Sequence, residues 1–323
     1  MKTWSVIASC LLLTLSSPWA SAAQPYPSKP IRFVVPFAPG SSSDVVTRIM
    51  AERLQSTLGQ PVVVENRTGA GGAIGAEMVA RAPADGYTLL TGLSASQIVN
   101  PLLVSKPTYD GIADFDPITQ VGTGTFFIVV HPSLPIHNLA ELISYVKSQA
   151  QGSVVYGSWG TGSGGHIVGE VIKDHEGLSM EHAAYKGSAP LVADLIAGHL
   201  KIGVTDASAS LPQIRAGKLR AIAATGSRRS PQLPDLPTIA EQGIPYTVDA
   251  WTGFFAPHGT PPTIIDRLHT EIRKVLQDTS LTERFKELGY SVSDVSPAEF
   301  RTIMARDTKT MKEVIQKAKI QID

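Results

Sequence analysis

The fold class follows from residues 31 to 59, IRFVVPFAPGSSSDVVTRIMAERLQSTLG. An apolar run typical of a buried strand leads through a Pro-Gly-Ser-Ser-Ser turn into a segment where Val46, Ile49 and Met50 have helical spacing. Further along the chain come the strand-like runs PVVVENR and YTLLTG, with the helix-like run GGAIGAEMVARA between them. This alternation predicts an α/β fold with a parallel sheet that is covered by helices.

A second α/β unit is predicted between residues 125 and 226, where strand-like and helix-like runs alternate again. The tail, residues 261 to 319, has helical patterns only, and its helices need a sheet to cover. The first unit has few helices of its own, so we expect it to host them. Two crossings of the chain between lobes make a hinge with a cleft beside it. The predicted limits are residues 23–122 plus 251–323 for domain 1 and residues 123–250 for domain 2.

The first 22 residues are predicted to be a cleaved export signal. Lys2 supplies the positive charge, VIASCLLLTLSS the apolar region, and Ala20-Ser21-Ala22 the small-residue cleavage site. The apolar run is too short for a membrane anchor. A lipoprotein signal at Cys10 is the minor alternative, because most of the apolar region follows this cysteine. Cleavage removes Cys10, the single cysteine, so we expect a soluble exported protein without disulfides or thiol chemistry.

Charge argues against nucleic acid as a partner. The sequence has 28 Lys and Arg against 28 Asp and Glu, for a formal net charge of zero. No overall basic field is therefore available to hold nucleic acid or an anionic membrane.

The loop after the first strand is the first candidate binding site. A glycine turn that opens a helix offers free backbone N–H groups and the positive end of the helix dipole to an anion. The loop has no lysine, which disfavours a nucleotide and suits a carboxylate better than a polyphosphate. The alternative is that one serine merely caps the helix. The candidate residues are Phe37, Pro39, Gly40, Ser41, Ser42, Ser43 and Asp44.

A second loop of this kind, YGSWGTGSGGHIVGE, covers residues 156 to 170. Its hydroxyls and successive N–H groups can form an anion-binding nest. Both loops follow strands, and open α/β sheets bind ligands at the carboxyl ends of their strands, so we expect the loops to face each other across the cleft. The candidate residues of this loop are Ser158, Trp159, Gly160, Thr161, Gly162, Ser163 and His166.

Three further residues follow strand-like runs of the second unit. Tyr185 and Lys186 end the run MEHAAYKG, and Lys186 offers a positive charge to an anion or is simply a solvated lysine at a turn. Asp206 follows KIGV and accepts a bond from a ligand hydroxyl or amine, or bonds its own turn.

Other chemistries have weaker support. The run GAGGAIG imitates a dinucleotide fingerprint, but Asn66, Arg67 and Thr68 separate it from the strand, so its glycines are better explained by tight helix-to-sheet packing. A serine hydrolase built on Ser163 and His166 is an alternative, although Thr161 stands where the Gly-x-Ser-x-Gly motif has its first glycine. The histidines lack HExxH-type spacing, so we expect neither a metal nor a cofactor.

Six stretches occur together in the order and spacing of one family. They are YPSKPIRFVVPFAPGSSSD, VVVENRTGAGGAIGAEMVARAPADGYTLL, GSWGTGSGGHIVGE, AAYKGSAPLVADLIAGH, GKLRAIAATGSRRSPQLPDLPTIAEQG and WTGFFAPHGTPPTIIDRL. Over almost its full mature length the chain resembles the extracytoplasmic solute-binding receptors of tripartite tricarboxylate transporter systems, the Bug proteins.

The resemblance implies a two-lobe, type II-like periplasmic-binding-protein (Venus flytrap) fold that closes on one small organic acid. It implies a periplasmic receptor, not an enzyme, that delivers its ligand to inner-membrane transporter subunits, with a membrane sensor as the alternative partner. We expect a monomer. The resemblance also implies that residues 37 to 44, with bridging waters, hold one end of the ligand and that residues 158 to 163 hold the other carboxylate. Ser94 and Ser96, in TGLSASQIVNP, match a further ligand-facing loop.

Two departures from the family pattern bear on the ligand. Ser41 stands where the family usually has a second glycine, and its side chain crowds a close backbone approach. Trp159 stands where a small residue is common and adds a flat apolar face. We therefore predict an aromatic or medium-chain carboxylate or dicarboxylate instead of a citrate-like acid.

Overall fold

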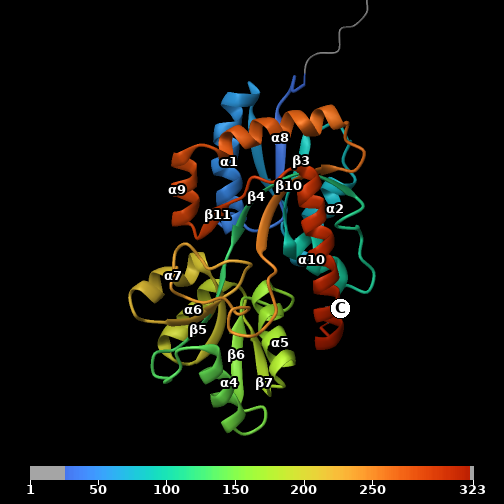
Figure 1. Cartoon of the computed structure of the whole chain (residues 1–323). Helices are drawn as coiled ribbons and strands as arrows, with labels where there is room; N and C mark the ends of the chain where they lie inside the picture. The colour runs from blue at the N-terminus through green and yellow to red at the C-terminus, as the bar shows by residue number, and fades with distance from the viewer. Residues whose placement is uncertain (1–25, 321–323) are drawn as a thin grey trace, which may run out of the picture.

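The computed structural model describes residues 26–320, so the predicted export signal lies outside the described residues. Figure 1 shows two halves stacked one above the other, each built from a sheet with helices on it. The upper half (lobe 1) contains the six-stranded sheet and the lower half (lobe 2) the five-stranded sheet. The predicted α/β fold with two lobes is confirmed.

The sheet of lobe 1 has the strand order β11-β4-β10-β3-β1-β2. Its strands, in chain order, are β1 (Ile31–Val35), β2 (Val62–Asn66), β3 (Thr88–Leu93), β4 (Phe115–Gly124), β10 (Ala250–Pro257) and β11 (Tyr290–Val292). The helices of this part of the chain are α1 (Ser42–Leu58), η1 (Ala70–Gly72), α2 (Ala73–Ala80), η2 (Ala95–Val99), α3 (Asn100–Leu103), α8 (Pro262–Leu276), α9 (Thr279–Glu287) and α10 (Pro297–Ala318).

The sheet of lobe 2 has the order β7-β6-β8-β5-β9. Its strands are β5 (Phe126–Val130), β6 (Val154–Ser158), β7 (Met180–Ala184), β8 (Ile202–Asp206) and β9 (Arg220–Ala224). Its helices are α4 (Leu139–Ser148), α5 (Gly164–Glu176), α6 (Ser188–Ala197) and α7 (Ala207–Arg215).

The prediction of a parallel sheet is only partly right, because in each sheet one strand enters from the hinge. The neighbours of β1 and of β6 are parallel to them, as predicted. However, β10 is antiparallel to β3 and β4, and β5 is antiparallel to β8 and β9. The parallel strands end at the hinge side, so a strand that begins there runs in the opposite direction. The short strand β11 is also antiparallel to its neighbour β4.

The chain changes sheet at two places. It leaves lobe 1 at the end of β4 and begins β5 one residue later, beyond Thr125. It returns through the segment between β9 and β10, residues 225 to 249. The domain limits given above stay a prediction.

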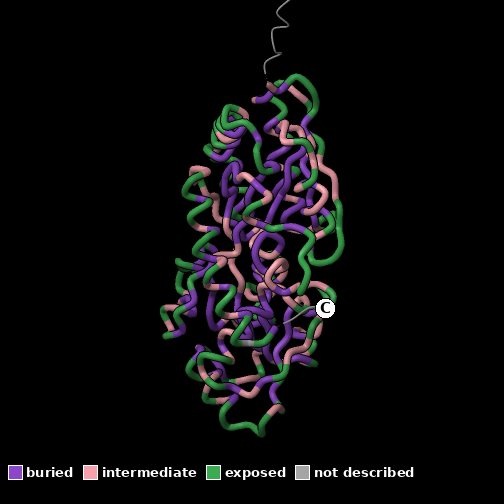
Figure 2. The backbone as a smooth tube through the Cα atoms, turned by 90° about the vertical axis from the view of Figure 1, so that its right-hand side faces the viewer, coloured by how far each residue is buried: buried purple, intermediate pink, exposed green. Residues whose placement is uncertain are grey.

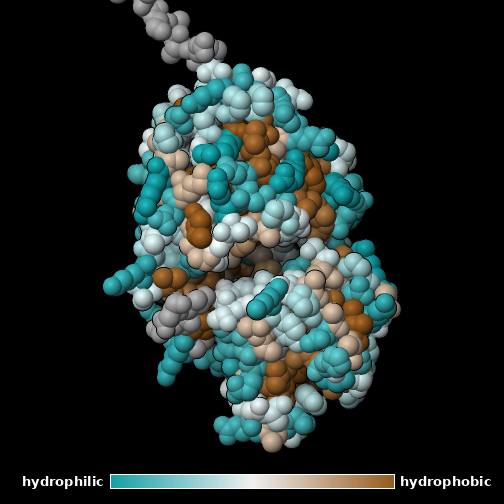
Figure 3. Space-filling view, turned by 180° about the vertical axis from the view of Figure 1, so that it is seen from behind, coloured by the Kyte–Doolittle hydropathy of each residue, from teal (hydrophilic) through white to brown (hydrophobic). Residues whose placement is uncertain are grey.

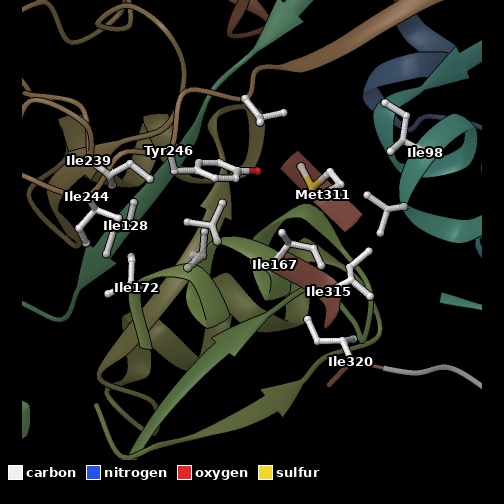
Figure 4. Close-up of a cluster of buried hydrophobic side chains, with 14 of the residues drawn as sticks. Ile98, Ile128, Ile167, Ile172, Ile239, Ile244, Tyr246, Met311, Ile315 and Ile320 are labelled. Carbon is white, nitrogen blue, oxygen red and sulfur yellow. The ribbon is translucent and has the colours of Figure 1, made fainter. Parts of the chain in front are cut away.

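Each lobe contains a buried apolar core of its own, and Figure 2 shows buried residues running through the middle of both halves with exposed residues outside. A third cluster spans the lobes. It includes Met311 and Ile315 of α10 together with Ile167 of α5 and Ile98 of η2, which lie around one another in Figure 4.

Helix α10 is therefore shared between the lobes, which the sequence did not predict. Near its start, Phe300 packs edge-to-face on Trp251 of β10, with ring centroids 5.0 Å apart. Its last turns run down beside α5 of lobe 2 (Figure 1), where Lys317 Nζ lies 3.8 Å from Asp174 Oδ2. A long helix with apolar residues along its whole length finds partners in both lobes.

Candidate functional site

The loops predicted to bind a ligand lie at the same side of both sheets. In lobe 1, β1 and β3 run toward the hinge, and the 37–44 loop and Ser94 follow their carboxyl ends. In lobe 2, Phe126 at the hinge pairs with Asp206 at the carboxyl end of β8, to which β6 is parallel. The space-filling view in Figure 3 shows the surface hollowed between the two halves. Topology therefore directs both sets of loops toward the space between the lobes.

The 37–44 loop is shaped by Asp44, which is buried. One of its carboxylate oxygens accepts bonds from the Gly40 N–H at 2.8 Å and from Arg48 Nε at 3.0 Å, and the other accepts a bond from Asn66 Nδ2 at 2.8 Å. Burial by itself would raise the pKa of this carboxyl, but these hydrogen bonds and the Arg48 charge outweigh it, so the pKa lies below its usual value. Asp44 thus holds the turn in which Gly40 has a φ of +79°.

The three serines of this loop have different surroundings. Ser41 caps α1, since its hydroxyl oxygen accepts a bond from the Asp44 N–H at 3.4 Å, and it lies 3.2 Å from the hydroxyl of Ser43. Ser41 is therefore the serine that caps the helix. Ser43 is buried, whereas Ser41 and Ser42 are partly exposed. Ser42 Oγ accepts a bond from the Tyr290 hydroxyl at 3.3 Å.

Phe37 and Pro39 belong to the loop as well, and the 94–96 turn lies near Phe37. Pro39 is exposed, and the ring of Phe37 lies beside Gly72 together with Ser96. Ser96 is fully buried, and its hydroxyl lies 3.1 Å from the N–H of Leu93 and so closes its own turn. Ser94, at the start of η2, is partly exposed. The glycines of the GAGGAIG run have the predicted packing role at Gly75, where a Cβ would lie 2.7 Å from the Arg67 carbonyl oxygen.

In lobe 2, the loop after β6 is organised by a chain of hydroxyls. Ser163 caps α5 by accepting a bond from the His166 N–H at 3.2 Å, and its own hydroxyl donates to Ser158 Oγ at 3.1 Å. Ser158 is fully buried and lies 2.8 Å from His182 Nε2. Gly160 and Gly162 turn the backbone with positive φ, and Thr161 between them is exposed.

Two histidine rings lie beneath this loop. His166 and His182 are stacked, with centroids 3.9 Å apart and 9° between the ring planes. The Gly162 N–H donates to His166 Nδ1 at 3.0 Å, and His166 Nε2 faces Glu170 Oε1 at 3.9 Å. Burial lowers the pKa of His166, and burial together with the neighbouring His166 lowers the pKa of His182 to about 4. Both rings are therefore neutral at neutral pH.

Trp159 lies on the hinge side of the loop. Its indole packs edge-to-face on Phe126, the first residue of β5, with centroids 4.8 Å apart. It also covers Gly165, where a Cβ would come within 2.5 Å of the indole ring. Trp159 remains partly exposed, so the pair forms an aromatic surface next to Thr125.

The remaining candidates have partners within lobe 2. The Tyr185 hydroxyl donates to Asp194 Oδ2 of α6 at 2.7 Å, and burial, with this carboxylate, raises the pKa of Tyr185 to about 12. Asp206 caps α7 through the Ala209 N–H at 3.0 Å and also accepts a bond from Ser188 at the start of α6. Lys186 is exposed.

The sequence reasoning missed three residues of this region. His182 lies two residues before the end of β7. This strand pairs with β6, which places His182 beside the loop that follows β6. Phe126 opens the strand opposite Asp206. Tyr290 had no local signal, because it reaches Ser42 from 248 positions away.

Membrane-spanning helices, metal-ligand groups and surface hollows are the remaining features considered in the described chain. Between residues 26 and 320, no helix combines the length and the apolar character needed to cross a bilayer. The described residues also contain no group of three or more His, Cys, Asp or Glu placed to hold a metal ion. Two surface hollows of ≈ 440 and ≈ 480 Å³, the first on α4 and the second beside α3, are lined by residues outside the 37–44 and 158–166 loops.

Comparison with known proteins agrees with this architecture. The sequence model of the tripartite tricarboxylate transporter family receptor matches residues 46–320. The chain is 37 % identical over 297 residues to protein BugT of Bordetella pertussis, which covers 91 % of this chain and 91 % of BugT.

Solved structures give the same result. The structure of Rpa4515 from R. palustris with adipate has a TM-score of 0.81 at 34 % identity and covers 92 % of this chain and 99 % of that one. MatC (Rpa3494) from Rhodopseudomonas palustris with bound malate has a TM-score of 0.77 at 29 % identity, with 90 % and 100 % covered. The resemblance noted from the sequence is thereby confirmed: the chain belongs to the tripartite tricarboxylate transporter receptor family, the Bug proteins, and has their two-lobe periplasmic-binding-protein fold.

Proposed function

We propose that this protein is a periplasmic receptor that captures a small organic carboxylate between its lobes and delivers it to the membrane subunits of a tripartite tricarboxylate-type transporter. The observation that carries the proposal is the pair of loops at the starts of α1 and α5. Each follows a parallel strand of a different sheet and ends in a serine that caps a helix. Both loops lack lysine, and neutral donors at helix N-termini suit carboxylates.

Within this proposal the candidate residues divide into two groups. Exposed and partly exposed residues of the two loops, together with Ser94 and Lys186, contact the ligand. Buried or fully bonded residues shape the loops: Ser43, Asp44, Ser96, Ser158, His166, Tyr185 and Asp206.

For the ligand class, we propose an aromatic or medium-chain carboxylate or dicarboxylate. The aromatic pair of Trp159 and Phe126 gives the lobe 2 side of the site an apolar surface, which matches a ring or a chain of methylene groups. The relative Rpa4515 was solved with adipate, a dicarboxylate of this kind. The relative MatC was solved with malate, so both sizes of acid occur among similar proteins.

The enzyme alternative has little geometric support. A serine nucleophile needs a base that accepts its proton. The Nδ1 of His166 instead accepts the Gly162 N–H, so it is not free to accept the proton of Ser163. Ser158, which does contact a histidine, is fully buried and out of reach of a substrate. We therefore propose that the protein binds its ligand without chemical change.

A thermal-shift panel followed by calorimetry tests the function. The panel contains adipate, longer dicarboxylates, benzoate-type acids, malate and citrate. A ligand at ~100 times its Kd adds about 2.7 kcal/mol to the free energy of unfolding, which raises Tm clearly. We expect the largest shift with aromatic or medium-chain acids and recovery of the acid unchanged. Tight binding of citrate or malate alone would refute the ligand class, and no shift with any acid would refute the carboxylate receptor.

We also propose that the chain is exported by its leader and acts as a monomer. Fractionation of the expressing cells, with N-terminal sequencing of the recovered protein, tests the first statement. Light scattering with and without the acid found above tests the second.

A further inference from the structure

The hydroxyl of Ser158 has more polar neighbours than it can satisfy. Its oxygen lies 2.8 Å from His182 Nε2, 3.0 Å from the Gly160 carbonyl oxygen, 3.1 Å from Ser163 Oγ and 3.3 Å from the Gly160 nitrogen. A serine hydroxyl donates one hydrogen bond and accepts two. One of the four contacts is therefore given up in any arrangement of the protons, and the identity of that contact depends on His182.

The first arrangement has Ser158 donating to His182. The Gly160 carbonyl oxygen then faces a lone pair of Ser158 at 3.0 Å, which places two acceptors against each other. The two acceptor positions of Ser158 are taken by the Gly160 N–H and by the Ser163 hydroxyl. In this arrangement the proton of Ser163 is turned inward.

The second arrangement has Ser158 donating to the Gly160 carbonyl oxygen. His182 Nε2 then carries a proton and donates at the shortest of the four distances, 2.8 Å. The Gly160 N–H, fixed by the backbone, takes the remaining acceptor position. No position is left for the Ser163 proton, which is released. The oxygen of Ser163 still accepts the His166 N–H of the helix cap.

We propose that His182 is a positioning residue for the ligand: as the Nε2–H tautomer it donates to Ser158 and so turns the Ser163 hydroxyl outward to donate to a carboxylate oxygen. The proposal deepens the proposed function and rests on a carboxylate bound at the 158–163 loop. It explains why a partly buried histidine lies beneath a loop whose other donors are neutral.

The surroundings of His182 hold its ring in the orientation that this role needs. It stacks on His166 and is also 5.0 Å from the ring of Tyr156, at 31°. Tyr156 is held by its bond to Glu170 Oε1 at 2.8 Å, and His166 by the Gly162 N–H. Because His166 Nδ1 is an acceptor, a neutral His166 has its proton on Nε2, toward Glu170.

NMR of the protein with ¹⁵N-labelled histidine gives the direct test. In the protein with adipate bound, or with the first acid that raises Tm in the panel, we expect the Nε2–H tautomer at His182. An Nδ1–H tautomer there would overturn the proposal. The spectrum of the protein without added acid separates the two claims: if no acid binds, the proposed function fails, and the tautomer in that spectrum still decides the direction of the Ser158 bond.

Affinity measurements test the consequence for binding. His182→Leu removes the N–H and keeps an apolar side chain, while His182→Gln supplies a side-chain amide that can donate to Ser158. A hydrogen bond to a charged group predicts that His182→Leu and Ser163→Ala each weaken binding about tenfold or more. We expect His182→Gln to recover most of the loss and the double variant to lose little beyond either single variant.

His175→Gln is the matched control, since His175 lies near the end of α5 and bonds Glu176. Wild-type affinity in His182→Leu would overturn the proposal, as would additive losses in the double variant. If His182→Leu does not fold, the comparison of His182→Gln with Ser163→Ala still decides, because a failed rescue in a folded His182→Gln protein contradicts the role of the N–H.

Discussion

The Tyr290 hydroxyl donates to the hydroxyl oxygen of Ser42 at 3.3 Å and thereby ties β11 to the start of α1. Burial, with the charge of Asp206 in lobe 2, raises the pKa of Tyr290, so its hydroxyl stays protonated and able to donate. Beside it, a Cβ on Gly289 would lie 2.8 Å from the Cβ of Ala207 at the start of α7. The two lobes therefore meet next to the 37–44 loop.

Tyr290→Phe is expected to weaken ligand binding without unfolding the protein. The change removes one hydrogen bond, worth about 0.5 to 1.5 kcal/mol, so calorimetry should show a loss of roughly two- to tenfold in affinity. Tyr145→Phe on α4 serves as the control. Unchanged affinity in Tyr290→Phe would show that the bond to Ser42 does not prepare the loop for the ligand.

Asp44→Asn is expected to lower the free energy of unfolding by about 1 to 3 kcal/mol, because an amide nitrogen then faces groups that are themselves donors. Since the folded pKa of Asp44 is lowered, the carboxylate stabilises the protein above the unfolded value of about 4, and this stabilisation is lost as the pH falls through the folded pKa. Urea unfolding of both proteins over a pH series measures this, with the exposed Asp266→Asn as control. If the difference in the free energy of unfolding between the two proteins stays constant down to acidic pH, the stabilising role of the Asp44 carboxylate is contradicted.

Trp159→Ala is expected to reduce selectivity for aromatic and medium-chain acids. Loss of the indole face should cost such ligands roughly tenfold in affinity, while malate changes less because it makes little apolar contact. Trp159→Phe keeps an aromatic ring and should retain the preference. Equal losses of affinity for adipate and malate would show that Trp159 supports the loop but does not contribute to ligand selectivity.

Ile315→Ala is expected to destabilise both lobes. Removal of a buried aliphatic side chain costs about 2 to 4 kcal/mol, measured by urea unfolding. Hydrogen exchange of the α5 amides should accelerate as well, because Ile315 belongs to the cluster shared with that helix. Lys312→Ala, at an exposed position on α10, is the control. If the variant is destabilised but hydrogen exchange of the α5 amides stays slow, the loss of stability is confined to lobe 1.

The alternating pattern of the sequence predicted most elements, because strands such as β1 and helices such as α1 bury continuous or periodic apolar residues. It also predicted the two loops, since glycine, serine and a helix start have local signatures. The antiparallel direction of β5 and β10 depends on which lobe the chain enters from, which no local pattern records.

Side-chain partners were the least predictable part. Asp44 and Ser96 were expected to face the ligand. In the structure Asp44 bonds Gly40, Arg48 and Asn66, and Ser96 bonds Leu93. Tyr290 and His182 contribute through partners 248 and 24 positions away. Such contacts depend on the assembled sheets, so sequence spacing alone does not reveal them.

Because α10 packs on both lobes, separation of the lobes at this point exposes Met311, Ile315 and the facing Ile167 to water. Such exposure increases the heat capacity, and the hydration of apolar groups becomes less unfavourable on cooling. The balance between joined and separated lobes therefore depends on temperature, and cold shifts it toward separation.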